Sequence, residues 1–386
     1  MSTVSLIRCE QYGRKEVEEA VHRAVNLMGG PAQFFKSGDQ VLLKPNMLSA
    51  NVPEKHITTH PEVVRAAACL VMDAGAKPCI GDSPALEPFS RVAAKSGMSA
   101  IARELGIPLV ELTNPTLVTS SHDSEFKKLE ISRQVLDADA VINLPKLKTH
   151  CQMLLTLGIK NLFGTVVGQQ KGEWHFMAGV DRDTFASLHL DIYQAVKPAL
   201  TILDGVWGME GHGPSNGSGR QLSLIAASAD TVALDITVCH LLGIPLESFP
   251  IYRVARTRTI GETSISRITL AGDPPHIFAP DNFRVPQLDS LSFVPGFLTR
   301  LSKRFFVSRP VCRSSVCTGC GQCASICPAK AIAITDEHSA FDYDRCIRCF
   351  CCQEICPENA ITFHRGLLVR MAGWLKALTR EPPSKH

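Results

Sequence analysis

Apolar and helical segments alternate along residues 1 to about 295. Short apolar runs predict strands, and longer stretches with apolar positions three or four residues apart predict helices. The predicted strands are Gln40–Leu43, Pro78–Gly81, Pro108–Leu112, Ala140–Leu144, Leu200–Leu203 and Leu222–Ala226, and the predicted helices are Pro61–Ala74, Phe89–Leu105, Thr184–Val196 and Asp230–Leu242. This alternation predicts an α/β fold with a largely parallel sheet and flanking helices.

Unusual polar segments follow several of the predicted strands. Parallel strands end at one edge of their sheet, and ligands bind beyond that edge. We therefore expect these segments to converge on one site. The residues they contribute, together with those of the segment Gly158–Gly164, are Lys44, Asn46, Asp82, Lys146, Lys148, His150, Lys160, Asn161 and Asp204.

The lysines of this set suit a carboxylate or phosphate ligand, and a desolvated lysine can act as a base. We assign catalytic roles to Lys146, Lys148 and His150, with His150 as a proton donor. The ligand-binding residues are expected to be Lys44, Asn46, Asp82, Lys160, Asn161 and Asp204. The alternative is that the lysines form surface salt bridges.

Other polar groups allow weaker interpretations. A further metal site would draw on His150, His175, His212, Asp82, Asp204 and Glu210, but no close ligand spacing links the histidines. Gly208–Gly219 lacks the spacing of a phosphate loop, so we interpret it as a flexible lid. Cys151 follows His150 and is either a reactive thiolate or a small buried hydrophobe.

Cysteine content changes the picture near the C-terminus. Nine of the 15 cysteines fall between residues 317 and 356, a distribution that indicates metal binding rather than disulfides. Two runs share the spacing C-x2-C-x2-C-x3-C-P, and the second repeats the first 29 residues later. The runs are Cys317, Cys320, Cys323 and Cys327, followed by Cys346, Cys349, Cys352 and Cys356.

This spacing predicts a small α+β ferredoxin-like domain with two 4Fe-4S clusters. Three cysteines of a run wrap one cluster, and the fourth ligates the other. We assign cluster 1 to Cys317, Cys320, Cys323 and Cys356, and cluster 2 to Cys346, Cys349, Cys352 and Cys327. Cys312 and Cys351 do not fit the repeat and are interpreted as non-ligands. The alternatives are a zinc site or a purely structural cluster.

The chain divides into four expected parts. They are an α/β domain over residues 1–295, a basic linker over 296–310, a ferredoxin domain over 311–364 and a basic amphipathic tail over 365–386. The tail has the pattern of an amphipathic helix that packs against the protein, and peripheral membrane contact through this helix is the alternative. No apolar run approaches the ~20 residues of a membrane span, so we expect a cytoplasmic protein. A net charge of +3 and the lack of a basic, aromatic stripe exclude nucleic acid as a partner.

Six motifs between residues 38 and 245 resemble a known family, the domain of unknown function 362, which is often fused to ferredoxin modules. In order they are LLKPN, TTHPEVV, GDSP, NLPKLKTH, GIKNLFG and LDGVWGMEGHGP. The resemblance implies a cytoplasmic iron–sulfur protein of redox character.

Three functions compete at this point. The first is an electron-transfer protein that exchanges electrons with a redox protein partner and whose α/β domain binds that partner or a small anionic ligand. The second is a redox enzyme that uses cluster electrons to reduce a substrate at the strand-end loops. The third is a non-redox enzyme whose clusters are structural. The convergence of polar loops favours a bound ligand, since a docking domain has little need of it.

Overall fold

The computed structural model describes residues 2–84, 87–119, 124, 126, 128–168, 170–178, 181–286 and 309–364. The chain forms two compact units, Met1–Pro286 and Gln287–His386. We call the described parts of these the α/β unit and the cysteine-rich unit. Apart from residues 309 and 310, the predicted linker and tail lie outside the described residues.

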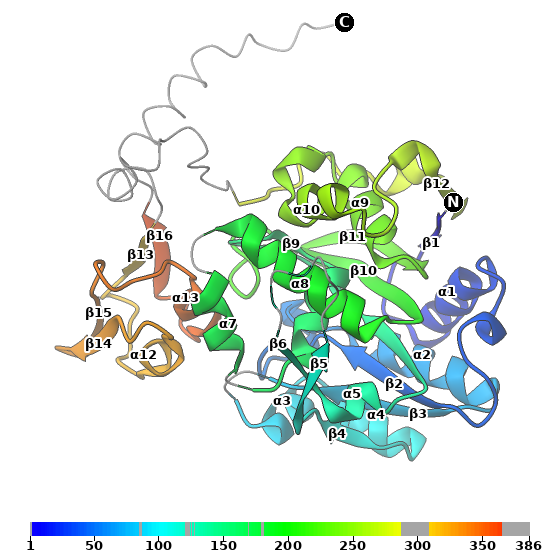
Figure 1. Cartoon of the computed structure of the whole chain (residues 1–386), viewed down its shortest axis with the longest axis horizontal. Coiled ribbons are helices and arrows are strands. Elements are labelled where there is room, and N and C mark those ends of the chain that lie inside the picture. The colour runs from blue at the N-terminus through cyan, green and yellow to red at the C-terminus, as the bar shows by residue number, and fades with distance from the viewer. Residues whose placement is uncertain are drawn as a thin grey trace, which may run out of the picture. The chain divides into compact units, whose positions relative to one another are not determined.

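A ten-stranded sheet forms the centre of the α/β unit (Figure 1). Its strand order is β12-β1-β11-β10-β7-β2-β3-β4, and β8 pairs with both β10 and β9. The strands are β1 (Ser2–Arg8), β2 (Gln40–Pro45), β3 (Lys77–Asp82), β4 (Leu109–Glu111), β7 (Ala140–Leu144), β8 (Lys146–His150), β9 (Leu154–Thr156), β10 (Leu200–Glu210), β11 (Ser218–Ser228) and β12 (Ile268–Gly272). Only β9 and β11 run antiparallel to their neighbours in this sheet. The predicted α/β fold with a largely parallel sheet is confirmed.

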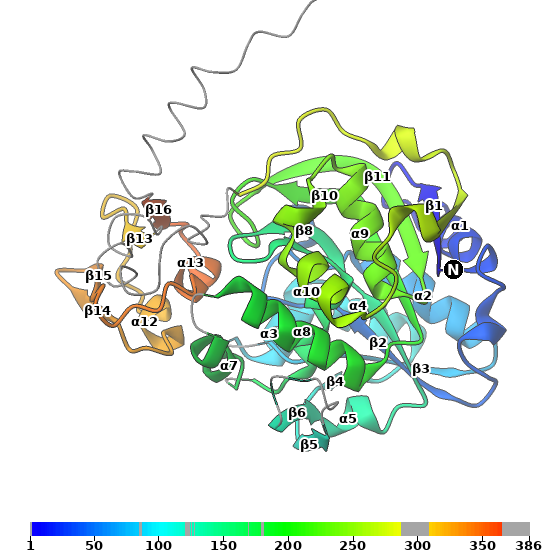
Figure 2. The same cartoon turned by 45° about the horizontal axis from the view of Figure 1, so that its top comes forward.

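Helices cover both faces of this sheet (Figure 2). Helices α1 and α2 pack together on one face, and α9 packs against β1, β10 and β11 on the other. The helices of this unit are α1 (Arg14–Asn26), α2 (Pro61–Asp73), α3 (Phe89–Lys95), α4 (Met98–Leu105), α5 (Arg133–Leu136), α6 (Gly158–Asn161), α7 (Gln170–Ala178), α8 (Arg182–Val196), α9 (Thr231–Leu241) and α10 (Pro250–Arg258). A separate hairpin joins β5 (Pro115–Thr119) to β6 (Lys128–Ser132).

Burial is continuous along the central strands, as a sheet covered on both faces requires, and successive side chains face opposite layers. Val41 and Leu43 of β2, with Ile142 of β7, belong to the core beneath α1 and α2. The intervening Leu42 is 3% exposed and faces the opposite layer. Because both faces are dry, polar side chains are confined mainly to the strand ends.

Capping side chains fix where two helices begin near those ends. Asp230 accepts hydrogen bonds from the backbone N–H groups of Val232 and Ala233 at 3.0 Å and so starts α9. At α2, Pro61 occupies the first turn, and the His60 side chain accepts from the backbone N–H of Glu62. Both arrangements satisfy donors that a helix leaves unpaired at its start.

The structure corrects three sequence expectations. The single helix predicted over Phe89–Leu105 is two helices, because Gly97 adopts a left-handed conformation with φ of 84° between them. The segment after β7 was expected to be a loop, but Lys146–His150 is strand β8, which pairs with the long strand β10. Both ends of the expected lid over Gly208–Gly219 are strand, since β10 continues to Glu210 and β11 begins at Ser218, and residues 211–217 form the turn between them.

The cysteine-rich unit consists of two short antiparallel pairs of strands and two single-turn helices (Figure 1). Strand β13 (Arg309–Cys312) pairs with β16 (Ile361–His364), and β14 (Ile332–Thr335) pairs with β15 (His338–Phe341). Helices α12 (Gln322–Ile326) and α13 (Cys351–Ile355) carry cysteines of the two runs. This is the small α+β ferredoxin-like arrangement that the spacing predicted.

Candidate functional site

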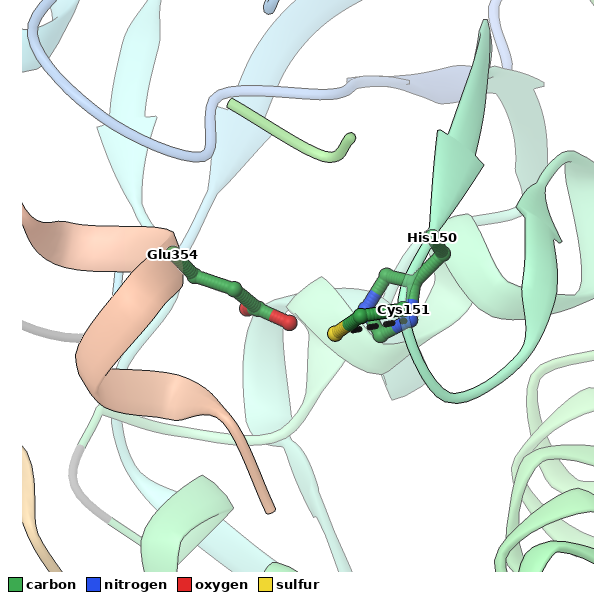
Figure 3. Close-up of side chains that lie close together, drawn as sticks. All are labelled: His150, Cys151 and Glu354. Atoms are coloured by element: carbon green, nitrogen blue, oxygen red, sulfur yellow. Dashed lines mark hydrogen bonds between the residues drawn. The ribbon is translucent and has the colours of Figure 1, made fainter. Parts of the chain in front are cut away.

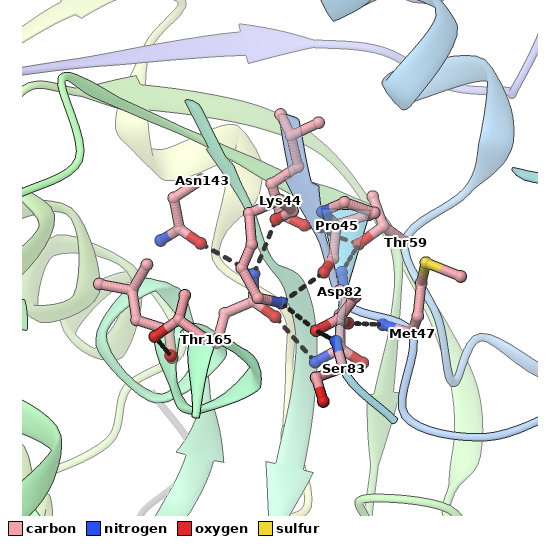
Figure 4. Close-up of polar contacts among 12 residues, drawn as sticks. Lys44, Pro45, Met47, Thr59, Asp82, Ser83, Asn143 and Thr165 are labelled. Carbon is pink, nitrogen blue, oxygen red and sulfur yellow. Dashed lines mark hydrogen bonds and ion pairs between the residues drawn. The ribbon is translucent and has the colours of Figure 1, made fainter. Parts of the chain in front are cut away.

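The predicted strand-end residues lie around the carboxyl ends of β2, β3 and β7, with β8 alongside and Asp204 in the middle of the longer strand β10. The closeness of the side chains is clear at the ends of β2 and β3 (Figure 4). Lys44, Lys146 and Lys148 are each only 1% exposed, so the alternative of surface salt bridges is wrong for these three lysines.

Lys44 and Asp82 form a buried ion pair at the ends of β2 and β3. Their charged atoms are 2.9 Å apart, and Lys44 Nζ also donates to the Pro45 carbonyl at 2.7 Å. Asp82 accepts from the backbone N–H groups of Met47 and Ser83 at 2.7 and 2.8 Å. Burial lowers the pKa of Lys44, and the Asp82 carboxylate opposes that effect.

Gly164 is required by this ion pair. A Cβ at position 164 would lie 2.2 Å from Asp82 Oδ1 and 2.5 Å from Lys44 Nζ, closer than atoms can approach. The final glycine of the GIKNLFG motif therefore has a packing reason, since only a residue without a side chain lets the backbone pass over the pair.

Lys146 and Asp204 form a second buried pair, at a distance of 2.9 Å. The Tyr12 hydroxyl accepts from Lys146 Nζ at 2.7 Å and donates to Asp204 at 2.7 Å. The other Asp204 oxygen accepts from the backbone N–H of His60 at 2.9 Å, and the His60 ring stacks on Tyr12 with centroids 3.6 Å apart. Lys146, Asp204 and Tyr12 thus bind one another within the protein, which gives the network a structural role.

An amide chain links Lys148 to the sheet interior. Lys148 Nζ donates to Asn46 Oδ1 at 2.9 Å and to the Ile57 carbonyl at 2.7 Å. Asn46 donates in turn to Asn161 Oδ1 at 2.9 Å, and Asn161 donates to Asn143 Oδ1 at 2.8 Å. Three predicted residues are thus brought into one hydrogen-bonded set.

His150 ends β8 and lies beside Cys151 (Figure 3). Its Nδ1 accepts the backbone N–H groups of Gln152 and Met153 at 3.1 and 3.3 Å, so a neutral His150 ring carries its proton on Nε2. The Cys151 sulfur is 4.0 Å from the same Nδ1. The geometry therefore gives His150 the tautomer that a proton donor at Nε2 needs.

Lys160 lies on α6, and its position is set by Asp235. The Asp235 carboxylate accepts the backbone N–H groups of Gly158 at 2.7 Å and Ile159 at 3.0 Å, which fixes the start of this short helix. Burial raises the pKa of Asp235 to about 7. Lys160 itself is half-buried, with Nζ 5.9 Å from the centroid of the Phe163 ring.

The structure gives little support to a further metal site at the predicted carboxylates. Asp82 and Asp204 each bind a lysine, and Glu210 pairs with Arg284 at 2.8 Å. Carboxylates held by cations within the protein are poor ligands for an additional metal ion.

Four of the predicted cluster ligands line one cavity in the cysteine-rich unit. The cavity has about 280 Å³ of empty space, part of it open to solvent, and its wall includes Cys317, Cys320, Cys323 and Cys356. Four thiols around one space are the donor set that a 4Fe-4S cluster needs. Cys356 belongs to the second run, so the cavity has the composition expected of crossed ligation.

The other four cysteines are also neighbours. Burial raises the pKa of Cys346, and the nearby Cys349 and Cys327 raise it further. Cys352 is affected in the same way, first by burial and then by Cys349, Cys346, Cys323 and Cys327. Burial among other thiols disfavours a free thiolate, and iron would relieve that cost by taking up the negative charge.

Backbone donors complete the fit of the cysteine-rich unit to iron–sulfur clusters. The N–H of Ala331 donates to Cys327 Sγ, and the N–H of Ala360 donates to Cys356 Sγ, both at 3.2 Å. Such bonds stabilise sulfur that carries negative charge. The fourth cysteine of each run therefore has the same supporting contact.

Comparisons with known proteins agree with the two units. Residues 41–240 match the model of the domain of unknown function DUF362, and residues 316–360 match a 4Fe-4S dicluster domain. The chain belongs to the DUF362 family. A thylakoid-associated protein of Synechocystis sp. (strain ATCC 27184 / PCC 6803 / Kazusa) is 37% identical over 309 residues, which cover 80% of this chain and 95% of that protein.

The matching 4Fe-4S domain makes this DUF362 chain an iron–sulfur protein. Two solved structures are distantly similar. A Thermotoga maritima protein has a TM-score of 0.37 at 10% identity, covering 58% of this chain and 57% of its own. The lactate racemase apoprotein from Thermoanaerobacterium thermosaccharolyticum has a TM-score of 0.36 at 14% identity, covering 61% and 56%. At these scores neither structure supports an inference about function.

Within the described ranges, every helix is too short or too polar to cross a bilayer.

Some further residues of the DUF362 site lie inside the sequence motifs but were not predicted as site residues. Thr59 and His60 belong to TTHPEVV, and Asn143 belongs to NLPKLKTH. Tyr12 and Lys171 had no such signal, because each reaches the strand ends from a distant element.

Lys171, at the start of α7, is a buried amine that the sequence interpretation missed. Its Nζ donates to the carbonyl oxygen of Ser83, directly after β3. Burial lowers the pKa of Lys171 to about 7, an effect that Asp82 opposes and Lys44 reinforces. Lys171 therefore loses its proton near neutral pH, unlike an exposed lysine.

This pKa predicts a pH-dependent stability. Between about pH 7 and the ordinary lysine pKa of 10.5, the unfolded chain binds a proton that the folded chain lacks. The free energy of unfolding should therefore rise with pH across this window, by at most about 1.4 kcal/mol per pH unit. Lys171→Met should lose this pH dependence. Its free energy of unfolding should exceed that of the wild type by the largest margin below pH 7.

Heat unfolding followed by tryptophan fluorescence tests the prediction, because Trp174 and Trp207 lie in the α/β unit. The wild type and Lys171→Met should differ in the slope of stability against pH. Identical slopes would mean that Lys171 keeps an ordinary pKa in the folded protein.

Proposed function

We propose that this protein transfers electrons through two 4Fe-4S clusters in its cysteine-rich unit. The observation that carries the proposal is the cavity shared by Cys317, Cys320, Cys323 and Cys356, in which the last ligand comes from the other run. Two clusters joined by crossed ligation lie close together, so single electrons pass from one to the other. The donor and acceptor are expected to be redox protein partners.

We further propose that the strand ends of the α/β unit bind a small anionic ligand. The support is the hydrogen-bonded set of Lys148, Asn46 and Asn161, with Lys160 on the neighbouring helix. Ammonium and amide donors suit a carboxylate or phosphate. Lys44 and Lys146 have a different role in this proposal, because Asp82 and Asp204 already balance their charges.

A redox enzyme is the second candidate, and the His150 geometry favours it. Reduction of an organic substrate needs protons as well as electrons, and a neutral His150 presents N–H at Nε2. In this version the chain is an oxidoreductase. His150 donates the proton, and Lys148 holds the anionic part of the substrate.

A peripheral position on the cytoplasmic face of a membrane is the proposed location. The support is that the Synechocystis relative is named a thylakoid-associated protein. Residues 365–386, which lie outside the described residues, supply a basic and apolar sequence suited to anionic lipid.

The cluster proposal predicts that Cys327→Ser damages cluster 2 rather than cluster 1. The anaerobically purified wild-type chain should contain about eight iron atoms, and the variant should lose up to about half of them. Iron analysis and electron paramagnetic resonance measure the loss. Cys351→Ser is the matched control and should retain all the iron. An unchanged cluster 2 signal in Cys327→Ser would contradict crossed ligation.

The ligand proposal predicts that Lys148→Met weakens anion binding about tenfold or more, because a charge-assisted hydrogen bond contributes about 1.5–3 kcal/mol. Binding of inorganic phosphate and of acetate is measured by calorimetry on the full chain. Lys95→Met, which removes an exposed lysine of α3, is the control. Lys146 is unsuitable for this test, since its removal would leave Asp204 buried and unpaired at a cost of about 3–5 kcal/mol. Equal affinities in Lys148→Met and wild type would contradict the proposed site.

The location proposal predicts that a chain ending at His364 no longer sediments with vesicles. The full-length protein should bind vesicles that contain anionic phospholipid and bind neutral vesicles more weakly. Iron content of the shortened chain provides the control for folding. Undiminished binding by the shortened chain would show that residues 365–386 are not the membrane contact.

A further inference from the structure

The sequence repeat is also a structural repeat. A shift of 29 residues carries β14 onto β16, β13 onto β15, and α12 onto α13. The pairing registers agree: Ile332 pairs with Phe341 in one half, and Ile361 pairs with Cys312 at the corresponding place in the other. Positions at which the halves differ therefore show how the two cluster environments differ.

The first difference is a hydroxyl group present at only one of the two cluster sites. Ser339 Oγ lies 3.0 Å from Cys323 Sγ and 3.8 Å from Cys317 Sγ, and both sulfurs belong to the cluster 1 set. A cysteine that ligates iron has no proton to give, so the hydroxyl must be the donor. The equivalent position near cluster 2 is Pro310, whose side chain has no donor.

The second difference lies in the loops that wrap the clusters. Gly319 and Gly321 in the first run have φ of 64° and 76°, and their equivalents Arg348 and Phe350 have φ of 56° and 59°. The left-handed region suits glycine and disfavours residues with a Cβ. The second loop thus keeps an unfavourable conformation in order to carry larger side chains at these two positions.

Arg348 places a positive charge beside the ligands of cluster 2. Its backbone N–H donates to Cys346, and its half-buried, positively charged side chain lies between the ligands Cys346 and Cys349 in the chain. In the first run, Gly319 supplies the same backbone contact to Cys317 but no charge. The charge is therefore an addition to cluster 2 only.

Reduction adds one electron to a cluster that is already negative. A hydrogen-bond donor or a cation near the ligand sulfurs stabilises the reduced form more than the oxidised form, and so raises the reduction potential. Ser339 and Arg348 act by these two different means on two different clusters.

We propose that Ser339 and Arg348 tune the reduction potentials of the two clusters separately, Ser339 for cluster 1 through its hydroxyl and Arg348 for cluster 2 through its charge. This inference rests on the proposed function, since it requires both clusters. Each residue acts on the charge of its cluster and touches no substrate.

Potentiometric titration of the anaerobically purified full chain, followed by electron paramagnetic resonance, tests the inference. Ser339→Ala should lower the midpoint potential of cluster 1 by about 59 mV, which is equivalent to a tenfold change in the ratio of reduced to oxidised cluster. The midpoint potential of cluster 2 should stay unchanged. Arg348→Gln should lower the midpoint of cluster 2 alone. Cys327→Ser, in which cluster 2 is damaged, identifies the signals.

Matched variants separate tuning from damage. Ser325→Ala removes an exposed hydroxyl that donates to the Gln322 carbonyl and should move neither midpoint. Arg348→Lys keeps the charge and should restore most of the cluster 2 potential. Pro310→Ser introduces a hydroxyl at the position equivalent to Ser339 and should raise the cluster 2 midpoint, which a merely damaged cluster would not do.

Two results would overturn the inference and differ in what they leave standing. About eight irons per chain, with midpoints that stay fixed or shift together in Ser339→Ala and Arg348→Gln, would reject separate tuning and leave the two-cluster proposal intact. About four irons in the wild type would reject both proposals, because only one cluster would be present.

Discussion

A charge can be buried in a protein only where opposite charge or well-placed dipoles compensate it, and the strand ends of the α/β unit depend on that constraint. Lys44 and Lys146 are held by Asp82 and Asp204 at 2.9 Å. The backbone around them follows from these pairs, as Gly164 shows, because any side chain there would collide with Asp82. The motifs of the family thus specify how charges are buried at the strand ends.

The same constraint acts with opposite sign in the cysteine-rich unit. Thiolate ligands and an iron–sulfur core bring negative charge, and short peptide segments must supply donors to it. Ala331 and Ala360 do so with their N–H groups at equivalent places. Ser339 lies on one side only, so the repeat provides a shared framework, and departures from it distinguish the two proposed cluster sites.

Charge balance also decides which strand-end residues are available for function. Lysine and aspartate side chains that bind each other hold the strand ends in place, as Tyr12 does by joining Lys146 to Asp204. Lys148 and His150 follow on the same strand, β8, and make different contacts, with neutral oxygens and with backbone N–H groups respectively. The proposed ligand site therefore has a neutral foundation of paired charges, beside which Lys148 and His150 lie.

The sequence by itself determined the α/β alternation, the parallel sheet, the meeting of polar residues at the strand ends and the iron–sulfur module. These are local patterns: apolar periodicity fixes strands and helices, and cysteine spacing fixes the loop that wraps a cluster. Tertiary structure alone decided that Lys146–His150 is a strand, since β8 exists only because β9 and β10 pair with it. It also decided which aspartate balances which lysine, and that Tyr12 and Lys171 reach the same strand ends from distant elements. Hydrogen bonds and charge pairs form between atoms that meet only after folding, and spacing along the chain carries no record of those meetings.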